Sequence, residues 1–367
     1  MGAARGRTRP FVRKRRALWA GLVAALTAVA IPVAASAGAS PGQYEQTNLI
    51  SDIAGVARIT DANLVNPWGQ AAGPATPLWV ADNGKDVSTL YTGAVNGSIP
   101  VIAPLVVSIP GGAPTGVVWN ATDGFKVTTD KESAPANFIF DSEAGKITAW
   151  SRVVSGTTAQ VEHSREHAVY KGLAIASAGR ATYLYAANFH AGRIEIYNSR
   201  FKRVHLSGHF RDAKIPAGFA PFNVQELAGK LYVTYAKQDA QRHDDVAGPG
   251  NGFVDVFDTS GHLLARLVAH GDLNSPWGLA LAPASFGAFA GDLLVGNFGD
   301  GTIHAYDPMT GAPKGQLVNT DNNPIQINGL WALRFGNGVF GARDTLVFTA
   351  GIADESHGLL GEISPAK

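Results

Sequence analysis

The sequence has 367 residues, with 43 glycines, no cysteine, 16% charged side chains and a formal net charge of +1 at pH 7. A hydrophobic fraction of 46% excludes wholesale disorder. The lack of cysteine excludes disulfide scaffolds, thiolate metal sites, iron–sulfur clusters and cysteine nucleophiles. The glycine excess, short apolar runs and few charges predict an all-β protein with many turns.

Residues 1–37 are predicted to be a secretory signal peptide. They carry seven basic side chains and no acidic one, with an uncharged run over 17–31 and then the small residues Ala35-Ser36-Ala37. A basic leader, an apolar stretch too short for a comfortable membrane span and a small-residue cleavage site are the parts of such a signal. Arg15-Arg16 also fits the twin-arginine pattern loosely. We therefore expect secretion, to the extracellular space or cell envelope, by the Sec or the twin-arginine route.

The charge of the remaining residues differs from that of the whole chain. Residues 38–367 carry 23 basic and 29 acidic side chains, which gives a net charge of −6. A mildly acidic domain disfavours nucleic-acid binding through a basic surface. Because these residues contain no second long apolar segment, we expect no membrane span in the mature chain. The expected partner is an extracellular or cell-envelope polymer or protein, and we expect a monomer.

A unit of about 50 residues recurs along the chain, and such a period indicates a repeat architecture. The clearest copy has a turn at Ser275-Pro276-Trp277-Gly278, followed by three short apolar runs separated by polar turns. Its opening motif recurs five more times. The predicted equivalent positions are Gly69, Gly116, Gly172, Asn223, Gly278 and Gly329.

Three strands and a weaker fourth in each unit predict a propeller blade, and six units predict a six-bladed β-propeller. The last unit ends soon after its third strand, whereas a strand-like segment over 44–53 precedes the first unit. We therefore expect this N-terminal segment to complete the last blade and to hide an open sheet edge. The predicted organisation is a signal peptide over 1–37 and one domain, with the N-terminal segment 38–65 and the propeller 66–367.

The repeat resembles the NHL class of propellers, whose unit reads P-x-G-hydrophobic, then G-x-hydrophobic-aromatic-V-A-D/N, then I-x-V-F/Y-D/N. The opening Asn48-Leu49-Ile50-Ser51-Asp52, followed by Asn66-Pro67-Trp68-Gly69, is similar to an exported bacterial family of conserved hypothetical proteins. That family occurs in genomes that encode PEP-CTERM sorting. The resemblance implies a propeller without an established activity. This chain departs from the sorted members because it lacks the terminal Pro-Glu-Pro motif and the membrane anchor.

The predicted ligand site is the channel face where the first strand of each blade begins and the second ends. Asparagine recurs there, and the candidate ligand-binding residues are Asn66, Asn188, Asn223, Asn297 and Asn328. Asn188 and Asn223 are also candidate metal ligands, because Ca²⁺ takes such oxygen donors. The alternative is that asparagine stands in these turns because it tolerates the left-handed conformation. Two insertions, over 237–252 and 351–358, are expected to project over the same face.

Two functions fit these features. The first is a secreted ligand- or protein-binding platform that uses the channel face. The alternative is a Ca²⁺-dependent hydrolase of the lactonase, esterase or polysaccharide-cleaving type, because gluconolactonase-type and paraoxonase-type propellers hold a metal in this way. For the hydrolase, His190, Asp239 or Glu355 is the candidate general base. The chain contains no P-loop, G-x-S-x-G, H-E-x-x-H or EF-hand motif.

Overall fold

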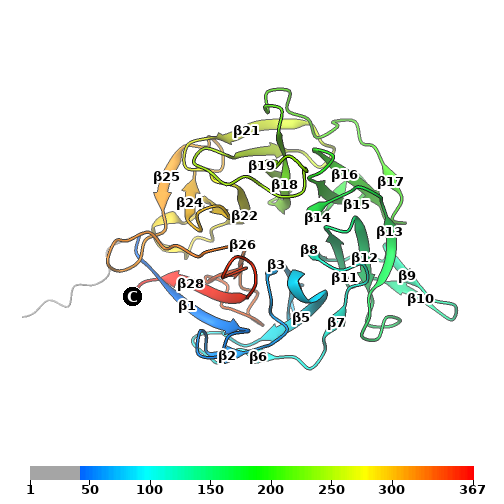
Figure 1. Ribbon diagram of the computed structural model, residues 1–367, viewed down its shortest axis with the longest axis horizontal. Helices are drawn as coiled ribbons and strands as arrows, with labels where there is room; N and C mark the ends of the chain where they lie inside the picture. The colour runs from blue at the N-terminus through cyan, green and yellow to red at the C-terminus, as the bar shows by residue number, and fades with distance from the viewer. Residues whose placement is uncertain (1–41) are drawn as a thin grey trace, which may run out of the picture. The chain divides into compact units, whose positions relative to one another are not determined.

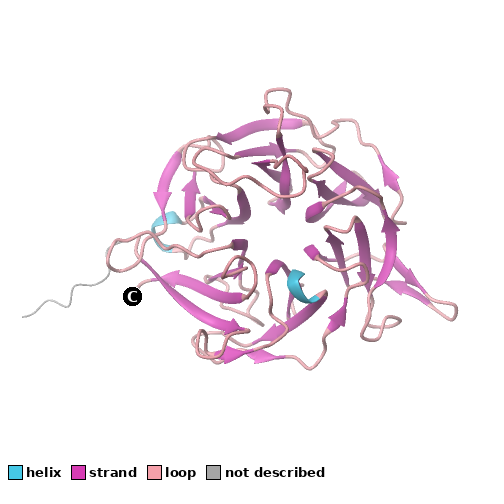
Figure 2. Cartoon of the chain, in the orientation of Figure 1, coloured by secondary structure: helices cyan, strands magenta, loops and turns pink. Residues whose placement is uncertain are grey.

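Six sheets of mostly antiparallel strands, here called blades, follow one another around a central channel in the computed structural model (Figure 1). The structure describes residues 42–367, so the predicted signal peptide lies outside the described residues. Within residues 42–367 the only helices are two short 3-10 turns, η1 (Asn83–Lys85) and η2 (Gly287–Phe289), and Figure 2 shows strands and loops elsewhere. No helix in this part of the chain is long and apolar enough to cross a membrane. The six-bladed all-β prediction is confirmed.

The strands of the blades follow the order of the chain. Blade 1 contains β3 (Pro67–Ala71), β4 (Leu78–Asp82), β5 (Val87–Thr92), β6 (Val101–Ile102) and β7 (Val107–Ser108). Blade 2 contains β8 (Pro114–Trp119), β11 (Phe138–Ser142), β12 (Lys146–Trp150) and β13 (Gln160–Ser164), and a hairpin of β9 (Lys126–Thr128) and β10 (Ser133–Pro135) is inserted after β8. Blade 3 contains β14 (Tyr170–Ala178), β15 (Ala181–Asn188), β16 (Arg193–Asn198) and β17 (Arg203–Val204).

The second half of the ring is built in the same way. Blade 4 contains β18 (Phe219–Leu227), β19 (Lys230–Lys237), β20 (Phe253–Phe257) and β21 (Leu263–Ala269). Blade 5 contains β22 (Pro276–Leu281), β23 (Leu293–Asn297), β24 (Ile303–Tyr306) and β25 (Pro313–Gln316). Blade 6 contains β26 (Leu330–Phe335), β27 (Leu346–Ala350) and β28 (Leu359–Pro365) together with β1 (Tyr44–Ser51) and β2 (Ile59–Thr60).

The N-terminal strand β1 closes the ring by completing blade 6, as predicted. It pairs antiparallel with β28 from Tyr44 opposite Pro365 to Ser51 opposite Leu359. The Tyr44 ring is fully buried against Phe286 and Phe289, and its hydroxyl donates to the Phe286 carbonyl at 2.9 Å. This strand therefore covers the edge that β28 would otherwise expose.

A bulge near the start of every inner strand explains the recurring glycine. In blade 2, Pro114 pairs with Ser142 and Val117 with Phe140, so Thr115 and Gly116 lie in the bulge. The backbones of neighbouring inner strands approach closely at this position. A Cβ atom on Gly116 would lie 2.4 Å from the Leu173 nitrogen of blade 3. Glycine is needed here because any side chain would collide with the next blade.

The same register corrects one predicted equivalence. In blade 6, Leu330 pairs with Ala350 and Leu333 with Phe348, so Trp331 and Ala332 occupy the bulge. The predicted equivalent residue, Gly329, is wrong by three positions. Blade 6 has Ala332 where the other blades have glycine or Asn223. Because glycine is missing at this position, the sequence pattern points to Gly329 instead.

Candidate functional site

The channel is closed near one end by six buried side chains that stand at the same bulge position, one in each blade. We call this layer the waist, and it consists of Trp68, Thr115, Lys171, Phe222, Trp277 and Trp331. Trp68 stacks on Trp331 with ring centroids 3.5 Å apart, and Trp277 meets both rings edge-on. The matching positions of Trp68 and Trp277 in the repeat predict packing between neighbouring blades. This prediction is confirmed, because Trp331 of blade 6 packs on Trp68 of blade 1 and on Trp277 of blade 5.

Lys171 is the one charged member of the waist, and two carboxylates compensate its charge. Its side chain is 2% exposed, its Nζ atom bonds Glu143 Oε1, and it lies 3.1 Å from Asp244 Oδ1. The ammonium also lies 5.0 Å from the centre of the Trp68 ring, within cation–π range. Burial alone would lower the pKa of Lys171, but these two carboxylates outweigh it and raise that pKa. The lysine is therefore a fixed cation and not a nucleophile.

A third carboxylate lies at the same end of the channel, which we call the mouth. Glu355 Oε2 accepts a 2.7 Å hydrogen bond from Asn66 Nδ2, and Asn66 Oδ1 accepts one from Trp331 Nε1 at 3.1 Å. Asn83 Nδ2 donates to Glu143 Oε2 at 3.0 Å, so a second amide holds another carboxylate. Burial raises the pKa of Glu355, although the Asn66 hydrogen bond and Lys171 oppose the shift.

The three carboxylates come from equivalent loops of alternate blades. Glu143 follows β11 of blade 2, Asp244 lies in the insertion after β19 of blade 4, and Glu355 lies in the insertion after β27 of blade 6. In each blade this loop connects the second and third strands. Asp245, next to Asp244, also interacts electrostatically with Lys171. The mouth thus has more carboxyl groups than ammonium groups.

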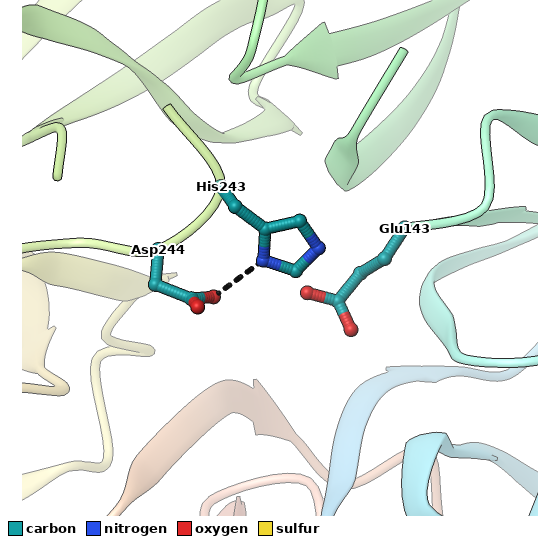
Figure 3. A group of neighbouring side chains, drawn as sticks. All are labelled: Glu143, His243 and Asp244. Atoms are coloured by element: carbon teal, nitrogen blue, oxygen red, sulfur yellow. Dashed lines mark hydrogen bonds and ion pairs between the residues drawn. The ribbon is translucent and has the colours of Figure 1, made fainter. Parts of the chain in front are cut away.

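A divalent cation would find ligand-type atoms in one part of the mouth. Among residues 42–367, the one group of three such side chains is Glu143, His243 and Asp244, whose ligand atoms lie within 4.8 Å of one another (Figure 3). His243 Nδ1 lies 2.9 Å from Asp244 Oδ1. Because Lys171 bonds the same two carboxylates, its ammonium already takes the place of a cation there. Two carboxylates and an imidazole suit Mn²⁺ or Zn²⁺ better than Ca²⁺, which takes oxygen ligands.

The structure brings one predicted asparagine, Asn66, directly to the carboxylate cluster. Three others hold backbone groups: Asn188 Oδ1 accepts from the Ala191 nitrogen, Asn223 Nδ2 donates to the Trp277 carbonyl, and Asn297 Nδ2 donates to the Asp272 carbonyl. Asn328 is exposed and makes no side-chain hydrogen bond within the described residues. The hydrogen bonds of Asn188 and Asn223 are those of turn and inter-blade contacts.

Of the three candidate bases, Glu355 belongs to the cluster directly. Asp239 accepts a 2.8 Å hydrogen bond from the His243 nitrogen, so it shapes the loop that presents His243 and Asp244. His190 is half-buried and has no side-chain hydrogen bond within residues 42–367. Both insertions reach the mouth, where Glu355 interacts electrostatically with Asp244 and Lys171.

Sequence reasoning did not select Glu143 and did not assign a role to Lys171. Glu143 follows the second strand of blade 2 in the same way as Asn83 follows the second strand of blade 1. This equivalence is the sequence feature that could have identified Glu143. Lys171 stands where four other blades have an aromatic ring. The signal available in the sequence is that Lys171 takes the repeat position that Trp68, Phe222 and Trp277 take in three other blades.

Fold and site together define a six-bladed propeller with an aromatic waist and an acid-rich mouth. No family model matches the chain. Two uncharacterized proteins of Acanthamoeba polyphaga mimivirus, R648 and L690, are each 31% identical over 324 residues. Those matches cover 86% of this chain, with 78% of R648 and 84% of L690. The chain therefore belongs to the same protein family as these two viral proteins.

Solved structures show similarity at much lower identity. A streptogramin B lyase is 10% identical, with 88% of this chain and 97% of that chain covered and a TM-score of 0.46. Virginiamycin B lyase from Staphylococcus aureus is 11% identical, with coverage of 88% and 99% and a TM-score of 0.45. No activity carries over from these structures.

Proposed function

We propose that the protein is a binding protein that takes a positively charged group of its ligand at the mouth. The observation that carries this proposal is the placement of Glu143, Asp244 and Glu355, on three alternate blades, around the single ammonium of Lys171. Asn66 and Asn83 hold two of these carboxylates in place before any ligand arrives. Preorganised acceptors reduce the cost of ordering a binding site.

The excess of carboxylates gives the site its selectivity. Lys171 is almost fully buried and already engaged, so it offers little to an incoming anion. Asp244, by contrast, is 65% exposed at its side chain. An amine or guanidinium can reach this carboxylate from solvent and form charge-assisted hydrogen bonds.

The chemistry of the mouth agrees with an extracellular partner of the kind the sequence suggests. A basic segment of a cell-envelope protein, or an amine-bearing polymer, would complement the mouth. Secretion through the signal over 1–37, and membership of the NHL-like and PEP-CTERM-associated families, remain predictions. N-terminal sequencing of the protein recovered from culture medium and from the envelope fraction tests the export step. A protein that retains residue 1 and stays inside the cell would contradict it.

Binding to poly-L-lysine and poly-L-glutamate, measured by biolayer interferometry, tests the charge preference. We expect the full chain to bind poly-L-lysine and not poly-L-glutamate, and the Glu143→Gln/Glu355→Gln double variant to bind at least about tenfold more weakly. The control is Glu132→Gln, which removes an exposed carboxylate on the β9–β10 turn. Equal losses in the control and the double variant would show only a general charge effect and would overturn the proposal.

The grouping of Glu143, His243 and Asp244 favours a second candidate, a metal-dependent hydrolase. A divalent ion there would supply a Lewis acid to polarise a lactone or ester carbonyl. We expect Mn²⁺ or Zn²⁺ to raise the melting temperature Tm of the full chain, and His243→Asn to abolish the shift. His262→Asn is the control, because His262 pairs with Asp258 in an exposed turn in the same way. Lack of a Tm shift with either metal, or with Ca²⁺, together with inactivity on a lactone and ester panel, would remove this candidate.

A further inference from the structure

On the other side of the waist the channel opens into a cavity of about 370 Å³, which we call the well. It lies at the opposite end of the inner strands from the mouth. Ser177, Gln225 and Arg334, toward the ends of β14, β18 and β26, line it, and Trp277 and Asn223 belong to its floor. This volume is in the range of pockets that hold small organic ligands.

Arg334 is a cation in the wall of the well, and within residues 42–367 no carboxylate makes an ion pair with it. Its one side-chain hydrogen bond in this part of the chain runs from Nη2 to the Ala72 carbonyl, at 2.9 Å. Its Nε atom is buried without a partner. Burial lowers the pKa of Arg334, because desolvation penalises the charged form and no nearby carboxylate offsets that penalty.

Two further side chains set the polarity of the well. Gln70, on the adjacent inner strand β3, donates from Nε2 to the Val347 carbonyl, whereas its Oε1 atom is buried without a partner. Glu226 lines the well from blade 4, is exposed, and accepts a hydrogen bond from the Gly229 nitrogen at 2.6 Å. The well therefore contains an uncompensated guanidinium, an unused acceptor and one carboxylate that lies beyond ion-pair distance of the guanidinium.

We propose that the well binds a small monocarboxylate, with Arg334 as the residue that recognises the carboxylate. A guanidinium offers two parallel N–H donors to a carboxylate, and this geometry is selective for planar oxyanions. A hydroxyl group beside the carboxylate would satisfy the Gln70 acceptor. Glu226 repels a second negative charge, so the well prefers monoanions to dianions.

The probes for this proposal are L-lactate, its neutral analogue L-lactamide, and succinate. Isothermal titration calorimetry on the full chain measures their affinities at pH 7. We expect lactate to bind more tightly than succinate, lactamide not to bind, and Arg334→Gln to weaken lactate roughly tenfold or more. Arg334→Lys keeps the positive charge but lacks the two parallel N–H donors of the guanidinium, and it should give an intermediate affinity for lactate. If lactate does not bind, or if Arg334→Gln leaves its affinity unchanged, the proposal is overturned.

A stability measurement separates recognition from a merely structural role. If Arg334 only joins blades 6 and 1 through the Ala72 carbonyl, Arg334→Gln will lower the Tm of the ligand-free chain, and lactate will not raise the Tm of the wild type. If Arg334 recognises the carboxylate, the ligand-free Tm will stay the same or rise, and lactate will stabilise the wild type alone. Glu132→Gln, which removes an exposed carboxylate outside both the mouth and the well, should leave the lactate response unchanged. Because lactate is an anion, its binding reports on the well and not on the cation binding proposed for the mouth.

Discussion

Lys171 and Arg334 lie on opposite sides of the waist, and the structure treats these two cations differently. Glu143 and Asp244 pair with the Lys171 ammonium, whereas the Arg334 guanidinium donates one hydrogen bond, to the backbone carbonyl of Ala72. The pKa of Lys171 is raised by its carboxylates against the effect of burial, and the pKa of Arg334 is lowered by burial alone.

This contrast shows how the protein distributes the cost of burying charge. A buried ion is costly unless an opposite charge and hydrogen bonds accompany it. At the mouth the chain itself provides that compensation, so Lys171 is part of the architecture, and the surplus carboxylates are those that we propose bind a ligand. At the well the compensation is missing from the described residues, which is why we assign that role to a carboxylate ligand.

The largest expected effect comes from removing the compensated cation. Lys171→Met leaves the Glu143 and Asp244 carboxylates without their ammonium, and we expect a loss of about 3 kcal/mol in the free energy of unfolding at pH 7. Burial would raise the pKa of Asp244, but Lys171 and His243 outweigh it and lower that pKa. The stabilisation by this pair should therefore be lost only as pH falls through the lowered pKa of Asp244. Urea unfolding at pH 7 and at a pH below 4 measures the difference. Arg334→Met is the matched comparison, and an equal loss for both variants would break the contrast between the two ends.

An intermediate effect is expected from forcing two blades apart at the waist. Gly116→Ala would place a Cβ atom 2.4 Å from the Leu173 nitrogen and 2.7 Å from Asp141 Oδ1. We expect a loss of about 2 kcal/mol in the free energy of unfolding. Gly116 and Leu173 line the well, and Lys171 lies two residues before Leu173 in blade 3. We therefore expect the affinities for the cationic probe and for lactate to fall together. Ala332→Gly, at the equivalent position of blade 6, should cost about 1 kcal/mol or less. If Gly116→Ala weakened binding only at the mouth or only at the well, the waist would not couple the two sites.

The smallest effect concerns a buried acid on β11, the second strand of blade 2, which extends the comparison from cations to a carboxyl group. Burial raises the pKa of Asp141 to about 7, although hydrogen bonds from Thr115 Oγ1 and the Gly116 nitrogen oppose the shift. The folded chain therefore holds a proton that an unfolded aspartate releases near pH 4, and stability falls as pH rises from about 4 to about 7.

Asp141→Asn should remove this pH dependence, because an amide does not titrate, while its oxygen can accept the same two hydrogen bonds. Above pH 7 the loss of the buried charge stabilises the variant, but its amide NH2 group stands buried without an acceptor in the place of Asp141 Oδ2. We therefore expect a net gain of about 1 kcal/mol over the wild type. Thermal unfolding from pH 4 to pH 8 measures the difference. Asp321→Asn, an exposed position, should leave the profile unchanged. If the Asp141→Asn variant kept the wild-type slope, Asp141 would not be the titrating group.

Much of the fold could be predicted because its causes are local and repeated. Every blade needs a close approach between inner strands, and that need appears in the sequence as the recurring Gly69, Gly116, Gly172 and Gly278. Blade 6 lacks the glycine, so the alignment failed there and only the strand register located Trp331. The closing role of β1 was predictable because the last blade lacked a fourth strand.

Less of the site could be predicted, because it depends on how far side chains reach across the channel. The repeat placed Asn66 and Glu355 on the same face of the propeller, but nothing in their spacing showed that one bonds the other. Topology likewise placed the opening at the mouth. The bulky Trp68, Trp277 and Trp331 close that level, and the open volume lies on the other side of them.

The pairing of β1 with β28 has a consequence for the timing of folding. β1 precedes every blade in synthesis, yet its hydrogen-bonding partner is the last strand of the propeller to be made. The ring therefore cannot close until synthesis has passed Pro365. Until then β1 has no partner strand from blade 6, and the first and the most recently completed blade each have a neighbouring blade on one side only. Shortening the chain from its C-terminal end into β28 would leave both ends of the array open, and such a chain should be captured by chaperones or proteases even though five of its blades are intact in sequence.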